Sequence, residues 1–425
     1  MRSRHVRYAI VLVAAWLCLP ATPVSAQSSD APTTPDTLLD GSTLSDVWVH
    51  INARDWEELH THYLEGTYYP VDFEWRGIRV RNSGIRVRGN TSRNDHKPSF
   101  RIDFNRYVTG QDFFGVNALV LNSSWHDASM LHDRLSMLLF RRMGIPAPRQ
   151  AHVRLYVGAN REFAGVYAVS EEVNKPFLDA TFGSHDGYLY EYHRQNGDHY
   201  GFEYHGPDLG WYIPRFGPKT HESDSVANLY TPIRALVEAI NDAPKSELED
   251  KLTGYFNVNI YITEIAVQNF LAQTDGLLGD FGMNNCYLYR FARTRLSQLI
   301  PWDQDASFSS MDMPPWHNMG ANVLASKIWD EPKYRAAYLK KLLEIADAAG
   351  PPAGAAGVDG WLRQEAAREY EQIRDAVHAD PLTPYSSDEF EQAVAFIDQF
   401  ARERADIVRQ YVARVAPEMF TANRR

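Results

Sequence analysis

Residues 274–290 of this 425-residue chain read TDGLLGDFGMNNCYLYR, and residues 299–305 read LIPWDQD. The first stretch is a polar loop that carries Asp275, Asp280 and Asn285 and leads into a strand-like run of aromatic and apolar residues. In the second stretch Asp303 and Asp305 are two residues apart, so on an extended segment both carboxylates point to the same side. The region therefore gathers oxygen-bearing side chains on either side of a short strand.

This pattern is chemically suited to a hard cation. Two carboxylates together with the amide oxygen of Asn285 form an oxygen-only site for Mg²⁺ or a similar ion. Asp275 or Asp280, on the preceding loop, is then available to orient or deprotonate a hydroxyl nucleophile. A single Asp in a loop more often caps a turn, and a structural Ca²⁺ site uses the same ligand types. Metal binding alone would therefore not establish catalysis.

The first half of the chain has the periodicity of strands. Ile78, Val80, Ile85 and Val87 alternate with arginines on either side of Asn82-Ser83-Gly84, which predicts a hairpin with one apolar face and one arginine-rich face. Further short strands are expected over 100–104, 151–157 and 165–169. The first helix is predicted from residue 128 to residue 143, with Asp127 as its cap.

The second half is mostly helical, because apolar residues recur at helical spacing over 258–266 and again over 390–411. Ser386 and Glu389 have capping-box spacing at the start of the last helix. The Gly/Pro/Ala stretch over 348–360 predicts a surface loop. The fold class is therefore α+β, with the strands concentrated in the first half.

Composition excludes several classes of protein. With 43 Lys+Arg against 54 Asp+Glu and a net charge of −11, nucleic acid is not expected as the main partner. Two cysteines supply neither a disulfide scaffold nor a Cys-rich zinc site. An aromatic content of 12% indicates a folded protein.

The N-terminus is typical of an exported protein. Three arginines precede the apolar run over 8–19, and Val24-Ser25-Ala26 follows it, which predicts a signal peptide over residues 1–26 with cleavage after Ala26. No segment has the roughly 20 apolar residues of a membrane-spanning helix. Residues 27–44 are expected to form a flexible leader and residues 45–415 the folded domain, in the secreted, periplasmic or cell-surface space.

The predicted arginine-rich face points to an anionic ligand. Arginines paired across a hairpin repel one another unless acids or phosphates lie opposite them. Lys97, which follows Gly89-Asn90-Thr91-Ser92-Arg93, is close enough in sequence to reach a phosphate as a point charge.

These motifs resemble those of the spore coat protein H (CotH) kinase family, over most of the chain from about residue 45 to residue 415. They occur in the family's order, as five pieces: residues 87–102 (VRGNTSRNDHKPSFRI), residues 121–129 (LNSSWHDAS), Gly165-Val166-Tyr167 leading to Glu171, residues 285–289 (NCYLY) and residues 301–305 (PWDQD). The last two are the most specific.

The resemblance implies an atypical protein-kinase-like two-lobed fold. Its β-rich N-lobe is expected over about 45–175 and its mostly helical C-lobe over about 176–415. It also implies an enzyme that binds ATP with Mg²⁺ or Mn²⁺ and phosphorylates Ser or Thr of a protein substrate. Protein kinases likewise place a catalytic Asp, a metal-binding Asn and a metal-binding Asp in this order along the chain.

Residue roles follow from the resemblance. Lys97 corresponds to the phosphate-contacting lysine, with Arg88 and Glu171 as further nucleotide-binding residues. Asn285 and Asp303 correspond to the metal ligands and Asp305 to a supporting acid. Asp275 corresponds to the catalytic aspartate, but Asp280 has the five-residue separation from Asn285 that the standard kinase catalytic loop shows, so either acid can hold that role.

A second hypothesis comes from a different class of protein. The usual Gly-x-Gly-x-x-Gly nucleotide loop is absent, and ATP is scarce outside the cell, both of which fit a non-catalytic, pseudokinase-like structural or surface-binding protein with a divalent-ion site. The joint presence of Lys97, Asp275, Asn285 and Asp303 favours the enzyme. The sequence indicates neither the protein substrate nor the oligomeric state.

Overall fold

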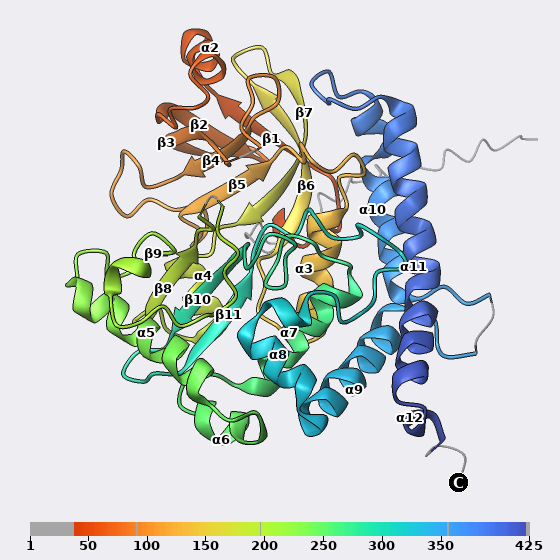
Figure 1. Ribbon diagram of the computed structural model, residues 1–425. Helices are drawn as coiled ribbons and strands as arrows, with labels where there is room; N and C mark the ends of the chain where they lie inside the picture. The colour runs from red at the N-terminus through yellow and green to blue at the C-terminus, as the bar shows by residue number, and fades with distance from the viewer. Residues whose placement is uncertain (1–37, 91, 196, 355–356, 422–425) are drawn as a thin grey trace, which may run out of the picture. The chain divides into compact units, whose positions relative to one another are not determined.

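The first half of the chain forms a closed β-barrel. The computed structural model describes residues 38–90, 92–195, 197–354 and 357–421 (Figure 1). The barrel has the strand order β1-β2-β3-β4-β5-β7-β6. Its strands are β1 (Ser45–His50), β2 (Tyr69–Trp75), β3 (Ile78–Arg88), β4 (Ser99–Asp103), β5 (Ala118–Asn122), β6 (Gln150–Val157) and β7 (Glu162–Glu171). Neighbours pair antiparallel except β1 and β6, whose parallel pairing closes the barrel.

Alternation along the strands fills the barrel with one set of side chains and turns the other set outward. Val87, Phe100, Leu121 and Val169 occupy one row across β3, β4, β5 and β7 and are all buried in the barrel core. Because strand side chains alternate, the next row, which includes Arg88 and Ser99, faces outward. The expected strands over 100–104, 151–157 and 165–169 are confirmed by β4, β6 and β7 within a few residues.

The predicted hairpin at Asn82-Ser83-Gly84 is wrong, because residues 78–88 form the single strand β3. The turn lies earlier, at Arg76 and Gly77, which both have positive φ, between β2 and β3. Asn82 also has a positive φ of 54°, but its N–H donates to Asp72 Oδ1 at 3.0 Å and makes a bulge, with two residues of β3 opposite one of β2. Asparagine in this conformation serves a bulge as well as a turn.

The flexible leader predicted for residues 27–44 ends earlier than expected. Leu38 and Leu39 are buried in the barrel core, at 1% and 2% exposure. The carbonyl of Gly41 accepts hydrogen bonds from Arg368 and Gln372. The packed structure therefore begins before residue 45. The predicted signal peptide over 1–26 lies outside the described residues.

A second sheet and the helices make up the rest of the chain. The sheet has the strand order β11-β10-β8-β9, with β8 (Tyr188–Tyr192), β9 (Phe216–Pro218), β10 (Cys286–Arg290) and β11 (Ser297–Pro301). The helices are α2 (Ala53–Thr61), α3 (His132–Arg142), α4 (Lys175–Phe182), α5 (Val226–Asp242), α6 (Leu248–Leu252), α7 (Val258–Phe270), α8 (Val323–Asp330), α9 (Pro332–Ala349), α10 (Trp361–His378), α11 (Ser387–Val415) and α12 (Glu418–Thr421). Strands thus dominate the first half and helices the second, which confirms the α+β class.

Helix boundaries follow local chemistry. The capping box predicted at Ser386 is confirmed, since its hydroxyl accepts from the Glu389 N–H at 3.3 Å and the Glu389 carboxylate accepts from the Ser386 N–H at 2.8 Å. Helix α3 starts four residues later than the predicted residue 128. Asp127 instead closes the preceding turn, by accepting from Ser129 N–H and His132 N–H at 2.9 and 2.8 Å.

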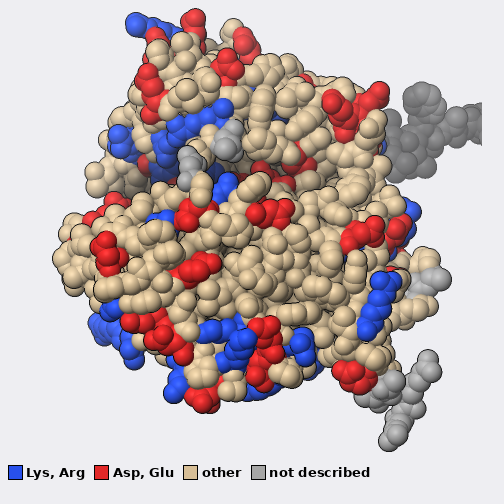
Figure 2. All heavy atoms as spheres, in the orientation of Figure 1, with Lys and Arg blue, Asp and Glu red and all other residues tan. Residues whose placement is uncertain are grey.

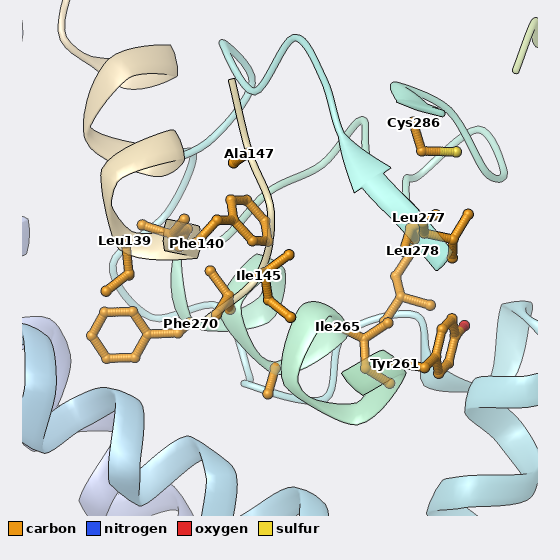
Figure 3. Close-up of a cluster of buried hydrophobic side chains, with 14 of the residues drawn as sticks. Leu139, Phe140, Ile145, Ala147, Tyr261, Ile265, Phe270, Leu277, Leu278 and Cys286 are labelled. Atoms are coloured by element: carbon orange, nitrogen blue, oxygen red, sulfur yellow. The ribbon is translucent and has the colours of Figure 1, made fainter. Parts of the chain in front are cut away.

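Apolar contacts hold the loop after α7 against the helices. Leu139 and Phe140 of α3 meet Ile265 and Phe270 of α7 in one buried cluster, which also contains Leu277, Leu278 and Cys286 (Figure 3). Leu277 and Leu278, in the middle of the polar loop at 274–285, are therefore held in the apolar core. Cys286 is buried and forms no disulfide in the described part of the chain.

None of the helices in the described ranges is both long enough and apolar enough to cross a membrane.

Candidate active site

The β10–β11 hairpin brings Asn285 and Asp303 together. Cys286 pairs with Pro301 at the end of the hairpin, and the Trp302 N–H donates to the Asn285 carbonyl at 3.0 Å. Asn285 and Asp303 have φ of 51° and 49°, in the left-handed region that Asn and Asp tolerate better than most residues. The two side chains that the sequence separates by 18 positions thus leave the same end of one hairpin.

Asp275 connects this hairpin end to the preceding loop. Its Oδ2 accepts from the side-chain amides of Asn284 and Asn285, each at 3.1 Å, and its carbonyl accepts from Asn285 Nδ2 at 2.9 Å. Arg194 Nη1 donates to its Oδ1 at 3.0 Å. Since the Asn285 nitrogen is engaged, its amide oxygen is left for another partner. Burial raises the pKa of Asp275, and Arg194 and the two asparagines oppose that rise.

Asp303 stands among other carboxylates without a hydrogen-bond donor of its own in the described part of the chain. Burial raises the pKa of Asp303, and Asp275 adds to the rise, while Arg88 and His126 act in the opposite direction. Burial raises the pKa of Asp305 well above its usual range, and nearby Asp303, Asp133 and other aspartates raise it further. The buried cluster thus resists full ionisation of its carboxyl groups.

Asp133, at the start of α3, belongs to the same cluster and was missed by the sequence analysis, because no local pattern distinguishes it. Its Oδ1 accepts from the Gln304 N–H at 2.8 Å, and its Oδ2 accepts from Gln150 Nε2 at 2.6 Å. It thereby fixes the backbone between Asp303 and Asp305. Burial, then the charge of Asp303, raises the pKa of Asp133 to about 7.

Arg88 is the cation whose charge acts most strongly on Asp303. It leaves the outer face of β3, its guanidinium lies over the Trp302 ring at 5.3 Å from the centroid, and its charge lowers the pKa of Asp303. The predicted nucleotide-binding residue on the barrel and the predicted metal ligand after β11 therefore lie close enough to interact electrostatically.

The oxygen ligands fit a divalent ion that brings ligands of its own. Asp303 has a carboxylate without a hydrogen-bond partner and Asn285 a free amide oxygen, both within the described residues. No three His, Cys, Asp or Glu side chains in those residues are arranged as a closed metal cage. Mg²⁺ rarely needs such a cage, since it keeps waters and binds substrate phosphates beside one or two carboxylates.

The sequence model described as "CotH kinase protein" matches residues 85–408, which is most of the chain. The chain belongs to the CotH kinase family. The match confirms the resemblance and, with it, the kinase-like α+β fold class.

One curated relative and two solved structures are similar to this chain. Inner spore coat protein H of Bacillus subtilis (strain 168) is 25% identical over 378 residues, which cover 85% of this chain and 96% of that protein. The Helicobacter pylori proinflammatory kinase CtkA aligns over 70% of this chain and 92% of its own, with 10% identity and a TM-score of 0.28. HipA of Shewanella oneidensis MR-1, in a complex with HipB and operator DNA, aligns over 70% of this chain and 59% of its own, with 11% identity and a TM-score of 0.31. Both TM-scores are too low to carry any argument about geometry.

Lys97 of this CotH-family chain is not beside the acidic cluster. Its ammonium forms an ion pair with Asp380 Oδ2 at 2.8 Å, and the two side chains are 1% and 0% exposed. It lies over the ring of Tyr167, in the barrel core, at 5.2 Å from the centroid. Burial lowers the pKa of Lys97, and Asp380 opposes that change. In this structure the lysine closes the barrel against the α10–α11 loop.

Asp380 also explains the Gly165-Val166-Tyr167 motif. Its Oδ2 accepts from the Val166 N–H at 2.8 Å, and a Cβ on Gly165 would stand 2.5 Å from its Oδ1. Gly165 has a φ of +107° as well, so a larger residue is excluded on two grounds. In this structure the Gly165-Val166-Tyr167 motif therefore binds a buried carboxylate from the C-terminal half of the chain.

Glu171 and Asp280 are held by other partners. Glu171 accepts from Arg149 Nε and Nη2 at 2.9 and 2.7 Å, at the end of β7. Asp280 is 43% exposed, and its Oδ1 pairs with His317 Nε2 at 2.6 Å and accepts from Asn318 Nδ2 at 2.9 Å. It lies close enough to Asp275 to raise the pKa of that group. The structure thus brings together Asp275, Asn285, Asp303, Asp305 and Arg88, with Asp280 at the edge.

We expect Asp133→Asn to reduce the pH dependence of stability of the metal-free protein. The pKa of Asp133 in the folded state, about 7, exceeds its ordinary value of 3.8. Its contribution to stability is therefore complete below about pH 4 and is lost as the pH rises to about 7, by up to roughly 1.4 kcal/mol per pH unit. Urea unfolding in EDTA at pH 5 and pH 7.5 measures the change in the free energy of unfolding between these two pH values.

We expect Asp133→Asn to preserve the hydrogen bonds around residue 133, because the Gln150 side-chain amide can turn over. Gln150 Oε1 is buried without a partner, so a flip of that amide supplies an acceptor for the new Asn side chain. The loss of stability between the two pH values should be smaller in the variant than in the wild type. Equal losses would show that Asp133 does not titrate in this range.

Proposed function

We propose that this chain is an exported atypical protein kinase, which transfers the γ-phosphoryl group of ATP to Ser or Thr of a secreted or surface protein. The observation that carries the proposal is the meeting of Asn285 and Asp303 at one hairpin end, with Asp275 bound to the Asn285 amide. Protein kinases need these three roles side by side. Membership of the CotH kinase family supports the same conclusion.

Asn285 and Asp303, with Asp305 as the supporting acid, would hold Mg²⁺ or Mn²⁺. The bound ion would neutralise charge on the phosphates of ATP. Burial, and then the charge of neighbouring aspartates, raises the pKa of Asp303 and of Asp305, and a bound cation would favour the ionised form of both.

Arg88, rather than Lys97, is the residue best placed for the phosphates. Burial, then the charges of Arg86 and Arg88, lowers the pKa of Arg93, so three guanidinium groups lie close together. None of the three forms an ion pair with a carboxylate of the described residues. Figure 2 shows Lys and Arg side chains gathered over the barrel above a hollow in this face, with Asp and Glu side chains below it. Such a cluster suits a polyanion.

Asp275 is the stronger of the two candidates for the acid that orients the substrate hydroxyl. It is bonded directly to Asn285, one of the two ligands proposed for the metal, whereas Asp280 is paired with His317. Its geometry is fixed by three side-chain donors, which is the pre-organisation that proton transfer requires.

We therefore expect Asp275→Ala to lower the rate of transfer from γ-labelled ATP by roughly 10²–10⁴-fold. Asp280→Ala, a matched change on the same loop, should stay within about tenfold of the wild type. Labelling of the protein itself, or of a Ser/Thr-containing acceptor, measures both. A larger loss in Asp280→Ala would assign the catalytic role to that acid.

The place of action and the partner are part of the proposal. The predicted signal peptide supports export, and the name of the Bacillus subtilis relative, inner spore coat protein H, supports a surface setting. The partner is then a secreted or surface protein and not a nucleic acid. The competing hypothesis is a non-catalytic protein of the same fold. Such a protein would not bind ATP and would not transfer a labelled phosphoryl group.

A further inference from the structure

A small cavity lies on the second sheet behind α7. Its volume is about 120 Å³, and it opens between the start of α7, the residues before it and β11. Aromatic and aliphatic side chains make most of its wall, with a few polar groups. The lining residues that matter here are Phe256, Ile260, Tyr261, Glu264, Phe291 and Leu296.

Glu264 is the one acidic group among the residues that line this cavity, and its carboxyl group is buried without a hydrogen-bond donor or a cation beside it. The residue is 1% exposed, and Oε1 is buried with no hydrogen-bond partner. Neither carboxyl oxygen receives a hydrogen bond from the described chain. Burial alone raises the pKa of Glu264 to about 8, since no cation lies close enough to counter it. A buried carboxyl group without partners is strongly unfavourable.

The neighbouring polar groups are already engaged. The Tyr261 hydroxyl donates to Asn322 Oδ1 at 3.0 Å. Gln268, one helical turn after Glu264, accepts from the Leu277 N–H with Oε1 at 2.8 Å, which fixes the orientation of its amide. Its Nε2 is buried without a partner. None of these groups donates to Glu264 in the described structure, which leaves its carboxyl group open to a partner from outside the chain.

We infer that this cavity is a binding site for a small organic ammonium ion. The ammonium group would donate to the Glu264 carboxylate, which releases its proton to solvent on binding, and its short alkyl body would lie among Phe256, Ile260 and Phe291. A carboxylate at the base of an aromatic wall is the pairing that organic cations favour. The volume is below the roughly 150 Å³ of a cavity that takes benzene, so the ligand has only a few heavy atoms.

The site lies directly behind the proposed catalytic loop. Gln268 connects the helical turn of Glu264 with Leu277, and its Oε1 would be 2.4 Å from a Cβ on Gly276. The binding itself does not depend on kinase activity.

The test is a thermal-unfolding series on the purified full chain with n-propylammonium chloride. We expect the midpoint to rise with ligand concentration relative to equal NaCl, because a ligand that binds only the folded state stabilises it. The neutral analogue n-propanol should give no rise. Glu264→Gln should abolish the shift, and Glu249→Gln, which removes an exposed acid of α6, should keep it.

A second variant covers the case in which Glu264→Gln fails to fold. Ile260→Trp enlarges a half-buried side chain on the rim of the cavity and should also abolish the shift. Three results would overturn the inference: no shift in the wild type, an equal shift in Glu264→Gln, or a crystal structure with n-propylammonium in which only water contacts Glu264. The last would make Glu264 a water-bridged structural residue.

Discussion

Asp303→Asn should lower phosphoryl transfer by about 10³-fold or more while leaving the fold intact. The expectation rests on the carboxylate's free oxygens, because a group that accepts no hydrogen bond from the described chain contributes little to packing. Its charge, in contrast, is needed by the ion on which transfer depends. Steady-state labelling from γ-labelled ATP with Mg²⁺ measures the loss.

Stability gives this prediction its control. Neutralising Asp303 removes one of the charges that raise the pKa of Asp133 and Asp305. The metal-free variant should therefore be as stable as the wild type, or more stable, in urea unfolding at pH 7.5. If Asp303→Asn is unfolded, its inactivity says nothing about the role of Asp303. Asp303→Glu then tests that role, because it should fold and should transfer the phosphoryl group slowly. Full activity in Asp303→Asn would contradict the proposed site.

Lys97→Met should destabilise the protein by about 3–5 kcal/mol, because it leaves Asp380 buried and unpaired. Adding Asp380→Asn should recover most of that loss, since both charges are then gone and the new amide oxygen still accepts from Val166 or Leu382. A double-mutant cycle in urea measures the coupling between the two residues.

The same variants separate two roles for Lys97. A lysine that serves the structure alone should leave ATP binding intact in the refolded double variant. If the double variant is stable and has lost ATP binding, Lys97 contacts the nucleotide as the family resemblance implies. Arg88→Ala is the matched comparison, and it should weaken ATP binding with little change in stability.

Local patterns in the sequence predicted part of the secondary structure. Alternation identified β4, β6 and β7, and the Ser386–Glu389 spacing identified the start of α11. The proximity of Asn285 and Asp303 could also be predicted from the sequence, because each residue flanks a strand and the two strands follow one another in the chain. These features depend on residues within one or two elements.

Features that depend on distant residues could not be predicted. Lys97 and Asp380 are separated by 283 positions, and no local signal joins them. Asn82-Ser83-Gly84 has the composition of a turn, and only Asp72 on the neighbouring strand makes it a bulge. Asp133 resembles any acid in the first turn of a helix until Gln304 is seen to donate to it.

Calorimetric titration of ATP into the full chain determines whether this protein binds a nucleotide together with a metal ion. We predict saturable binding that requires Mg²⁺ or Mn²⁺, that is lost in Asp303→Asn and that is weakened in Arg88→Ala. Absence of any binding to the wild type with either metal would contradict the account, and would leave a CotH-family protein that keeps the fold without the chemistry.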